Sequence, residues 1–306
     1  MIVREVVPGA MAGERIDRVI AMVTGLSRSE VADLVDAGAV LVDGAPITTR
    51  STRVRAGDEI EVDVPDPSAA AVLESDPHVE VRVVHEDDHL LVIDKPAGLV
   101  VHPGAGQRAG TLVQGLLARY PELRGVGDDP DRPGIVHRLD KGTSGLLLVA
   151  RSAEAHAALV VALAARHVHR RYRALVWGRV EAPRGLIDAP IGRSAREPTR
   201  MAVDERGKEA RTRYEVLQRF AEPVAVTELA CTLETGRTHQ IRVHLRSIGH
   251  AVVGDARYGG ERQSLPMARP FLHAERLELA HPTTGEALVF ESRLPDDLEV
   301  VLATLT

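Results

Sequence analysis

HRLDKGTSGLLLVAR, residues 137–151, joins a polar loop to an apolar run of the strand type. Two glycines, Gly142 and Gly145, punctuate the loop, and glycine allows a backbone to approach a ligand closely. The carboxylate of Asp140 lies in this loop, two residues after Arg138. The spacing alone leaves two interpretations open: a simple Asp-Lys-Gly turn between strands, or a ligand-binding loop with a reactive carboxylate.

The segments around this loop alternate irregularly between strand and helix patterns. We expect strand, turn and strand in VEVRVVHEDDHLLVIDKPAG (79–98), a helix in GTLVQGLLARY (110–120), a loop in GIVHRLD (134–140), a strand in GLLLVAR (145–151), a helix in EAHAALVVALAARH (154–167) and a strand in RRYRALVWGRV (170–180). Such an order, without regular strand-helix-strand units, favours an α+β domain with a mixed sheet over a doubly wound fold.

Residues 14–64 form a second, compact pattern before this region. We expect a helix in ERIDRVIAMVTG (14–25), then a helix that begins near Ser27, with Ser27 or Ser29 as N-cap, and ends around Gly38. Short strands follow in AVLVDG (39–44) and DEIEVDV (58–64), with turns at Asp43-Gly44 and Gly57-Asp58. The sequence therefore predicts a module at residues 1–64, a Pro-, Ser- and Ala-rich linker at 65–77 and a larger domain at 78–306.

Composition restricts the class of protein. The chain has 306 residues, of which 44% are hydrophobic and 27% charged, as in soluble globular proteins. No apolar run approaches the roughly 18 residues that a membrane span needs, and no secretory signal is visible, so we expect no membrane partner. The single cysteine, Cys231, excludes an internal disulfide and favours a buried thiol in a cytoplasmic protein, which we expect to be monomeric.

The net charge of -6 argues mildly against a nucleic-acid partner, but the charge is unevenly distributed. Residues 166–219 hold 14 Lys or Arg against 7 Asp or Glu, whereas residues 1–64 hold 7 against 11. A local basic stripe can bind phosphates when its side chains share one face. Structured RNA therefore remains a possible partner of the larger domain.

Four ordered blocks in the larger region resemble the RluA/RluD-type family of pseudouridine synthases. They are DKPAGLVVHPG (94–104), HRLDKGTSGLLLVAR (137–151), RRYRALVWG (170–178) and ETGRTHQIRVHL (234–245), followed by GDARYGG (254–260) and RPFLHA (269–274). The resemblance spans residues 78–290 and implies an α+β catalytic domain with a mixed, mainly antiparallel sheet. It also implies an enzyme that isomerises uridines in structured RNA, a reaction that needs no cofactor and no metal.

The resemblance also implies roles for individual residues. Asp140 would be the nucleophile, Arg242 the cation that keeps it ionised, and Tyr172 the group that takes the proton from carbon 5 of the base. Arg138 would fill the gap left when the uridine flips out of its stack. The further residues expected to bind substrate are His137, Lys95, Thr143, Arg237, His239 and Gln240.

Plainer interpretations exist for the three central residues. Arg242 could be a surface arginine on an alternating strand, QIRVHL (240–245). Tyr172 could be a strand aromatic packed in the core, and Arg138 a simple phosphate contact.

The N-terminal unit resembles the RNA-binding module named after ribosomal protein S4. The matching features are Arg15-Ile16-Asp17, Leu26-Ser27-Arg28-Ser29, Gly38 and residues 54–58. We expect Arg15, Ser27, Arg28 and Ser29 to contact RNA. The acidic balance of this unit departs from the usual basic module and predicts weaker binding.

Two other functions would each explain part of the sequence. His85-Glu86-Asp87-Asp88-His89 matches the zinc-protease motif H-E-x-x-H, but that motif requires a helix and these flanks are strand-like. A non-catalytic RNA-binding ribosome-assembly factor would explain the N-terminal module but not the HRLD block. The RNA that we expect as substrate is large-subunit ribosomal RNA, with transfer RNA as the alternative.

Overall fold

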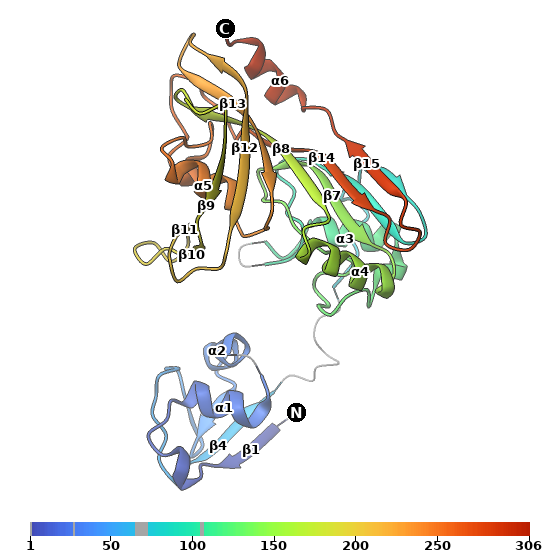
Figure 1. Cartoon of the computed structure of the whole chain (residues 1–306). Helices are drawn as coiled ribbons and strands as arrows, with labels where there is room; N and C mark the ends of the chain where they lie inside the picture. The colour runs from blue at the N-terminus through green and yellow to red at the C-terminus, as the bar shows by residue number, and fades with distance from the viewer. Residues whose placement is uncertain (1, 27, 65–72, 105–106) are drawn as a thin grey trace. The chain divides into compact units, whose positions relative to one another are not determined.

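The computed structural model describes residues 2–26, 28–64, 73–104 and 107–306 of the chain (Figure 1). The contacts between residues divide it into two compact units, residues 1–72 and residues 73–306. Each unit has its own hydrophobic core.

The smaller unit packs two helices against a four-stranded sheet. The strand order is β1 (Ile2–Val6), β4 (Glu59–Asp63), β2 (Val40–Val42) and β3 (Ala45–Pro46), and the helices are α1 (Ile16–Thr24) and α2 (Arg28–Asp36), with a short 3-10 helix η1 (Gly9–Met11). Ile16, Ile20 and Val35 of the helices pack against Val40 and Ile60 of the strands. The sheet is antiparallel throughout.

The predicted helices and strands of this unit are confirmed. Asp43 and Gly44 both have positive φ, 49° and 76°, and they join β2 to β3 at the pair Val42↔Ala45, the tight hairpin that Asp-Gly predicts. Strand β1 is not among the predicted elements, because it lies at the sheet edge and its side chains are mostly exposed. Ser29 lies inside α2, so it is not the N-cap, and Ser27 lies outside the described residues.

The larger unit is built on a nine-stranded, mainly antiparallel sheet, as the sequence predicts. The only parallel pairing in the described sheet joins β7 to β14, where His273 lies opposite Ser144. In sheet order the strands are β5 (Val83–Glu86), β6 (Leu90–Lys95), β7 (Ser144–Ala150), β14 (Leu272–Ala280), β8 (His169–Trp177), β13 (Val226–Leu233), β12 (Arg211–Phe220) and β9 (Arg184–Asp188), with β15 (Ala287–Glu291) paired to β14.

The remaining elements cover this sheet. They are α3 (Leu112–Arg119), η3 (Pro121–Leu123), α4 (Ala153–Ala164), the hairpin β10 (Ile191–Arg193) and β11 (Met201–Val203), α5 (Gln240–Ser247), η4 (Ala256–Tyr258) and α6 (Asp296–Ala303). Every residue of β7 is buried, because α3 lies over one face of the sheet and α4 packs over the other. Cys231 of β13 is a buried free thiol, as expected.

The H-E-x-x-H segment forms a β-hairpin, which confirms the predicted strand, turn and strand. His85 lies in β5 and His89 in the turn before β6. An Asp87 carboxylate oxygen accepts hydrogen bonds from the backbone of His89 and Leu90, and the other lies 2.7 Å from Nε2 of His85. The helical spacing that a zinc protease requires does not exist here.

The boundary between the units falls inside the predicted linker. Residues 65–72 lie outside the described residues. Residues 73–77 belong to the larger unit and form hydrogen bonds with the rest of it. The Leu73 carbonyl accepts a hydrogen bond from Arg124 at 3.0 Å, and the Asp76 amide donates one to Gln114 at 2.9 Å. Among the described residues, no helix combines the length and the apolar character needed to cross a membrane.

We predict that a chain without residues 1–64 folds with its larger unit intact, since that unit contains its own core and keeps the bonds of residues 73–77. Its melting temperature should stay within about 2 °C of the same transition in the full chain, less than the shift expected from losing 1 kcal/mol. Scanning calorimetry of the two chains measures this. Loss of a cooperative transition in the shorter chain would mean that the units depend on each other.

Candidate active site

The HRLD segment forms a loop that enters β7, and its glycines have a structural cause. A Cβ atom on Gly145, where φ is 109°, would lie 2.3 Å from the Ala274 carbonyl of β14. A Cβ on Gly142 would lie 3.0 Å from the Pro270 ring. These glycines thus permit a close approach of the loop to the neighbouring segment 269–274.

Lys95, which we expected to bind substrate, holds this loop instead. Its side chain is fully buried, and Nζ donates to the carbonyls of Pro96 and Leu99 at 2.8 Å and lies 3.5 Å from that of Lys141. It lines neither of the two cavities that reach Asp140. We therefore assign Lys95 to positioning the backbone next to Asp140.

Asp140 is joined to a buried chain of charges. The Arg242 guanidinium donates to Asp140 Oδ2 at 3.0 Å through one terminal nitrogen. Its other two nitrogens donate to both oxygens of Asp255, at 2.6 and 2.8 Å. Asp255 is fully buried and also accepts hydrogen bonds from the backbone of Arg257 and Tyr258. One guanidinium is therefore fixed by Asp255 on one side and presents charge to Asp140 on the other.

Arg242 lies on a helix, which excludes the alternative of a surface arginine on a strand. The segment 240–245 belongs to α5, and all six of its residues are buried, so the alternation of apolar residues does not reflect a sheet face. Burial alone would lower the pKa of Arg242, but the hydrogen bonds and charges of Asp255 and Asp140 raise it overall. The guanidinium therefore stays charged and stabilises negative charge on Asp140.

His239 lies on the other side of Asp140, with Nε2 4.0 Å from Oδ1. Its Nδ1 is 2.8 Å from the Tyr258 hydroxyl, which also accepts a hydrogen bond from the Met201 amide. The contact with the Tyr258 hydroxyl orients the ring of His239 so that Nε2 is the ring nitrogen that faces Asp140. Burial lowers the pKa of His239, against the opposing effect of Asp140.

Two cavities meet at Asp140. The larger has a volume of about 560 Å³ and the smaller about 40 Å³. Asp140, Arg138, Tyr172 and Arg237 line both, His137 lines the larger, and Thr143, His239, Gln240 and Arg242 line the smaller. The tertiary structure thus brings together all the residues expected at the catalytic site except Lys95.

Tyr172 belongs to β8 and is 4% exposed. Burial raises its pKa, and Asp140 adds to this while Arg170 opposes it. The side chain packs in the core, as the plain interpretation of a strand aromatic predicts, and also lines both cavities. Its phenol therefore stays protonated at neutral pH beside Asp140.

Protein partners occupy the side chain of Gln240 and one ring nitrogen of His137, another expected substrate contact. Gln240 accepts from the Thr235 hydroxyl and the Arg237 amide, and donates to the Arg211 carbonyl and the Thr212 hydroxyl, so it organises the loop before α5. His137 Nε2 accepts from the Leu148 amide, and burial lowers its pKa to about 3. His137 is therefore neutral, with its ring proton on Nδ1.

In the smaller unit, the expected RNA contact Arg15 is exposed at the start of α1. Its guanidinium forms two hydrogen bonds with Asp17, at 3.0 and 2.8 Å. Arg4, Arg18 and Arg50 are similarly paired with acidic residues, so much of the positive charge of this unit is neutralised locally. Ser27 and the side chains of Arg28 and Ser29 lie outside the described residues.

Several cavity and support residues had no predicted role. Asp255 and Tyr258, which hold Arg242 and His239, both lie in the GDARYGG block, so that block was the available signal. Arg170 and His102 line the larger cavity and are nearly buried. Nothing in their spacing distinguishes them from ordinary strand and loop residues.

Comparisons with known proteins find similar sequences over both units of the chain. Residues 89–247 match the model of the RNA pseudouridylate synthase family, and residues 14–60 match the S4 domain. A Xanthomonas campestris protein named ribosomal large subunit pseudouridine synthase D is 44% identical, over 98% of this chain and 91% of its own. An uncharacterised RNA pseudouridine synthase of Bacillus subtilis is 43% identical over 95% and 94%. The solved structure of human RNA pseudouridylate synthase domain containing 1 aligns with a TM-score of 0.59 and 28% identity, over 74% and 89%.

We predict that Asp255→Asn lowers the free energy of unfolding by about 1–3 kcal/mol, because a fully buried, charged hydrogen-bond partner of Arg242 is lost. Chemical denaturation monitored by circular dichroism measures this. Glu197→Gln, which removes the exposed ion pair with Arg200, is the control and should change it by less than about 1 kcal/mol. Equal effects of the two variants would show that Asp255 does not hold Arg242.

Proposed function

The chain belongs to the RNA pseudouridylate synthase family, and we propose that Asp140 is the nucleophile with which it isomerises uridines in large-subunit ribosomal RNA. Catalysis is assigned to residues 78–306 and RNA binding to residues 1–64. The observation that carries the proposal is the position of the Asp140 carboxylate, at the meeting point of two cavities and 3.0 Å from a guanidinium fixed by Asp255.

A charged carboxylate suits the reaction. The bond between ribose carbon 1 and base nitrogen 1 breaks, and a bond from the same carbon to base carbon 5 forms, while carbon 5 loses a proton and nitrogen 1 gains one. Asp140 supplies negative charge at the reacting nucleotide. The buried partner Asp255 lets Arg242 stabilise that charge without moving during the reaction.

Tyr172 handles the proton from carbon 5. Because burial keeps it a neutral phenol, its oxygen receives a proton as its own hydroxyl passes one onward to water. Its place in β8, with backbone partners on both sides in β13 and β14, fixes the ring against the cavity wall.

The larger cavity receives the flipped nucleotide. Its volume of about 560 Å³ lies within the range of roughly 300–1,000 Å³ usual for pockets that bind small molecules. Arg138 is exposed at its rim and fills the space that the uridine leaves in the RNA stack. Thr143 and His239 line the smaller cavity, and Arg237 lines both.

Two observations support large-subunit ribosomal RNA as the substrate. Relatives named ribosomal large subunit pseudouridine synthase D in Xanthomonas campestris and Pseudomonas aeruginosa are each 44% identical over 98% of this chain. The match of residues 14–60 to the S4 domain adds a second unit for binding structured RNA. The enzyme acts in the cytoplasm as a monomer, and transfer RNA is the alternative substrate.

We predict that Asp140→Asn leaves the fold intact and abolishes pseudouridine formation, because an amide has no charge for the reaction. A strain that lacks the gene should regain pseudouridines in large-subunit ribosomal RNA from the wild-type chain but not from this variant, as measured by mapping pseudouridines across all RNA. If a stably folded Asp140→Asn chain restores these pseudouridines, Asp140 is not the nucleophile. If pseudouridines are restored only in transfer RNA, large-subunit ribosomal RNA is not the substrate.

Tyr172→Phe should bind RNA with nearly unchanged affinity and turn over at least about 100-fold more slowly, because the ring remains and the hydroxyl is lost. Filter binding and single-turnover kinetics on the same RNA separate the two effects. Wild-type turnover in this variant would leave Tyr172 a packing residue only.

A further inference from the structure

Arg170 carries a positive charge into the cavity with no protein partner. It is 7% exposed, lies in β8 two residues before Tyr172, and lines the larger cavity with it. Alternate residues of a strand point to one face, so both side chains lie on the face that holds Asp140. Within the described part of the chain its guanidinium makes no hydrogen bond and no ion pair, and Nε is fully buried.

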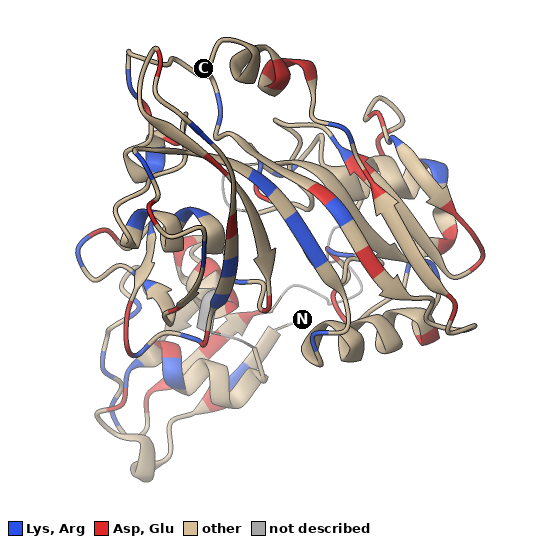
Figure 2. Ribbon diagram, turned by 45° about the horizontal axis from the view of Figure 1, so that its top comes forward, with Lys and Arg blue, Asp and Glu red and all other residues tan. Residues whose placement is uncertain are grey.

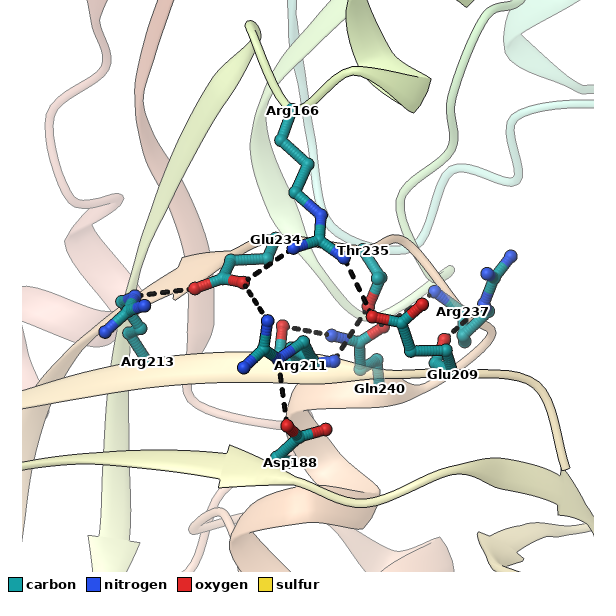
Figure 3. A network of polar contacts seen from close by, with 9 residues as sticks. All are labelled: Arg166, Asp188, Glu209, Arg211, Arg213, Glu234, Thr235, Arg237 and Gln240. Atoms are coloured by element: carbon teal, nitrogen blue, oxygen red, sulfur yellow. Dashed lines mark hydrogen bonds and ion pairs between the residues drawn. The ribbon is translucent and has the colours of Figure 1, made fainter. Parts of the chain in front are cut away.

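The other arginines of this region are paired. The Glu234 carboxylate forms ion pairs with Arg166, Arg211 and Arg213, with N···O distances of 3.3, 3.4 and 2.6 Å (Figure 3). Arg166 also reaches Glu209 at 2.8 Å. These acids line the same cavity as Arg170, but their oxygens are taken by other guanidinium groups.

The neighbours of Arg170 on β8 are paired as well. Arg171 and Arg173 point to the opposite face of the sheet, where Arg171 lies 3.1 Å from Glu275 and Arg173 bonds to Glu228. Basic and acidic residues thus lie side by side across the strands (Figure 2). Arg170 departs from this pattern, although a buried charge without a partner costs free energy.

The cavity as a whole favours an anion. It is lined by five arginines, at 132, 138, 166, 170 and 237, against three carboxylates, at 140, 209 and 234. The two histidines that line it add no charge, because burial lowers the pKa of His102 to about 4 and that of His137 to about 3. Asp140 is bound by Arg242, so the charge that would balance Arg170 has to arrive with the ligand.

We propose that Arg170 binds a phosphate group flanking the target uridine once that nucleotide has entered the cavity. The inference rests on the proposed function, because it assumes that the uridine binds beside Asp140. Uracil and ribose carry no charge, so phosphate is the anionic group that a nucleotide offers, and a guanidinium matches two of its oxygens at once. The buried Arg170 thereby becomes paired only in the complex with RNA.

Gly236 keeps room for this guanidinium. A Cβ atom at that position would lie 3.0 Å from a terminal nitrogen of Arg170. The absence of a side chain at 236 lets the loop 234–238 pass directly against the guanidinium at the cavity wall. Gly236→Ala should therefore displace the guanidinium without removing its charge.

Substitution should separate binding from stability. Arg170→Gln should raise KM about 10- to 100-fold with a smaller change in kcat, the loss expected for one charged hydrogen-bonded contact. Its melting temperature should be unchanged or higher, since an unpaired buried charge is removed. Arg171→Gln, on the opposite face of the same strand, is the matched control and should keep wild-type KM. A structural role for Arg170 predicts the reverse: a lower melting temperature and unchanged KM.

The decisive measurement uses RNA in which a single linkage beside the target uridine is an uncharged methylphosphonate. Wild type and Arg171→Gln should lose at least about tenfold in affinity for one of the two flanking linkages. Arg170→Gln and Gly236→Ala should be insensitive to that same replacement, because the contact is already lost or displaced. Equal sensitivity of wild type and Arg170→Gln at both linkages would overturn the proposal.

The outcome is distinguishable from failure of the proposed function. If Asp140→Asn is inactive while Arg170→Gln binds every RNA as wild type does, the phosphate contact is wrong and the assignment of the site stands. If Asp140→Asn is fully active, the uridine reacts elsewhere, and both assignments fall together.

Discussion

The buried ion pair between Asp255 and Arg242 is the constraint on which the site depends. Asp255 has no exposure, and its oxygens bind two guanidinium nitrogens and two backbone amides, so Arg242 can adopt only one position. From that position its remaining nitrogen reaches Asp140 from a helix more than 100 positions later in the chain. The free-energy cost of burying these charges is offset by their hydrogen bonds, and the result is that the charge on Asp140 is stabilised by a guanidinium already held in place.

The distribution of charge explains how a protein with a net charge of -6 can act on RNA. Most arginines of the larger unit are neutralised in place by carboxylates, as Glu234 neutralises three of them. Among the arginines that line the larger cavity, Arg138, Arg170 and Arg237 pair with no carboxylate of the described residues, so positive charge is available to the RNA backbone beside Asp140. In the smaller unit Arg4, Arg15, Arg18 and Arg50 pair with acidic residues, which is consistent with the acidic balance of residues 1–64.

Much of the fold follows from local patterns in the sequence. The strands β6, β7 and β8 and the helices α3 and α4 lie where alternation and apolar runs predict them. Two elements do not stand out in the local pattern: β1 is an exposed edge strand, and six consecutive residues of α5, 240–245, are buried, so their apolar alternation also fits a strand.

The sequence by itself determined which residues are candidates for the reactive groups, because Asp140, Tyr172 and Arg242 lie in blocks that resemble a known family. Only the tertiary structure decided which side chains are free to act. Lys95 and Gln240 carry polar groups that suit a substrate, yet backbone carbonyls and loop atoms occupy them. Arg170, Arg171 and Arg173 look alike in the sequence. Among these three, only Arg170 has no carboxylate partner within the described residues. Pairing depends on which residues face each other across the sheet and from distant loops, and this long-range geometry is not encoded in the local spacing of the chain.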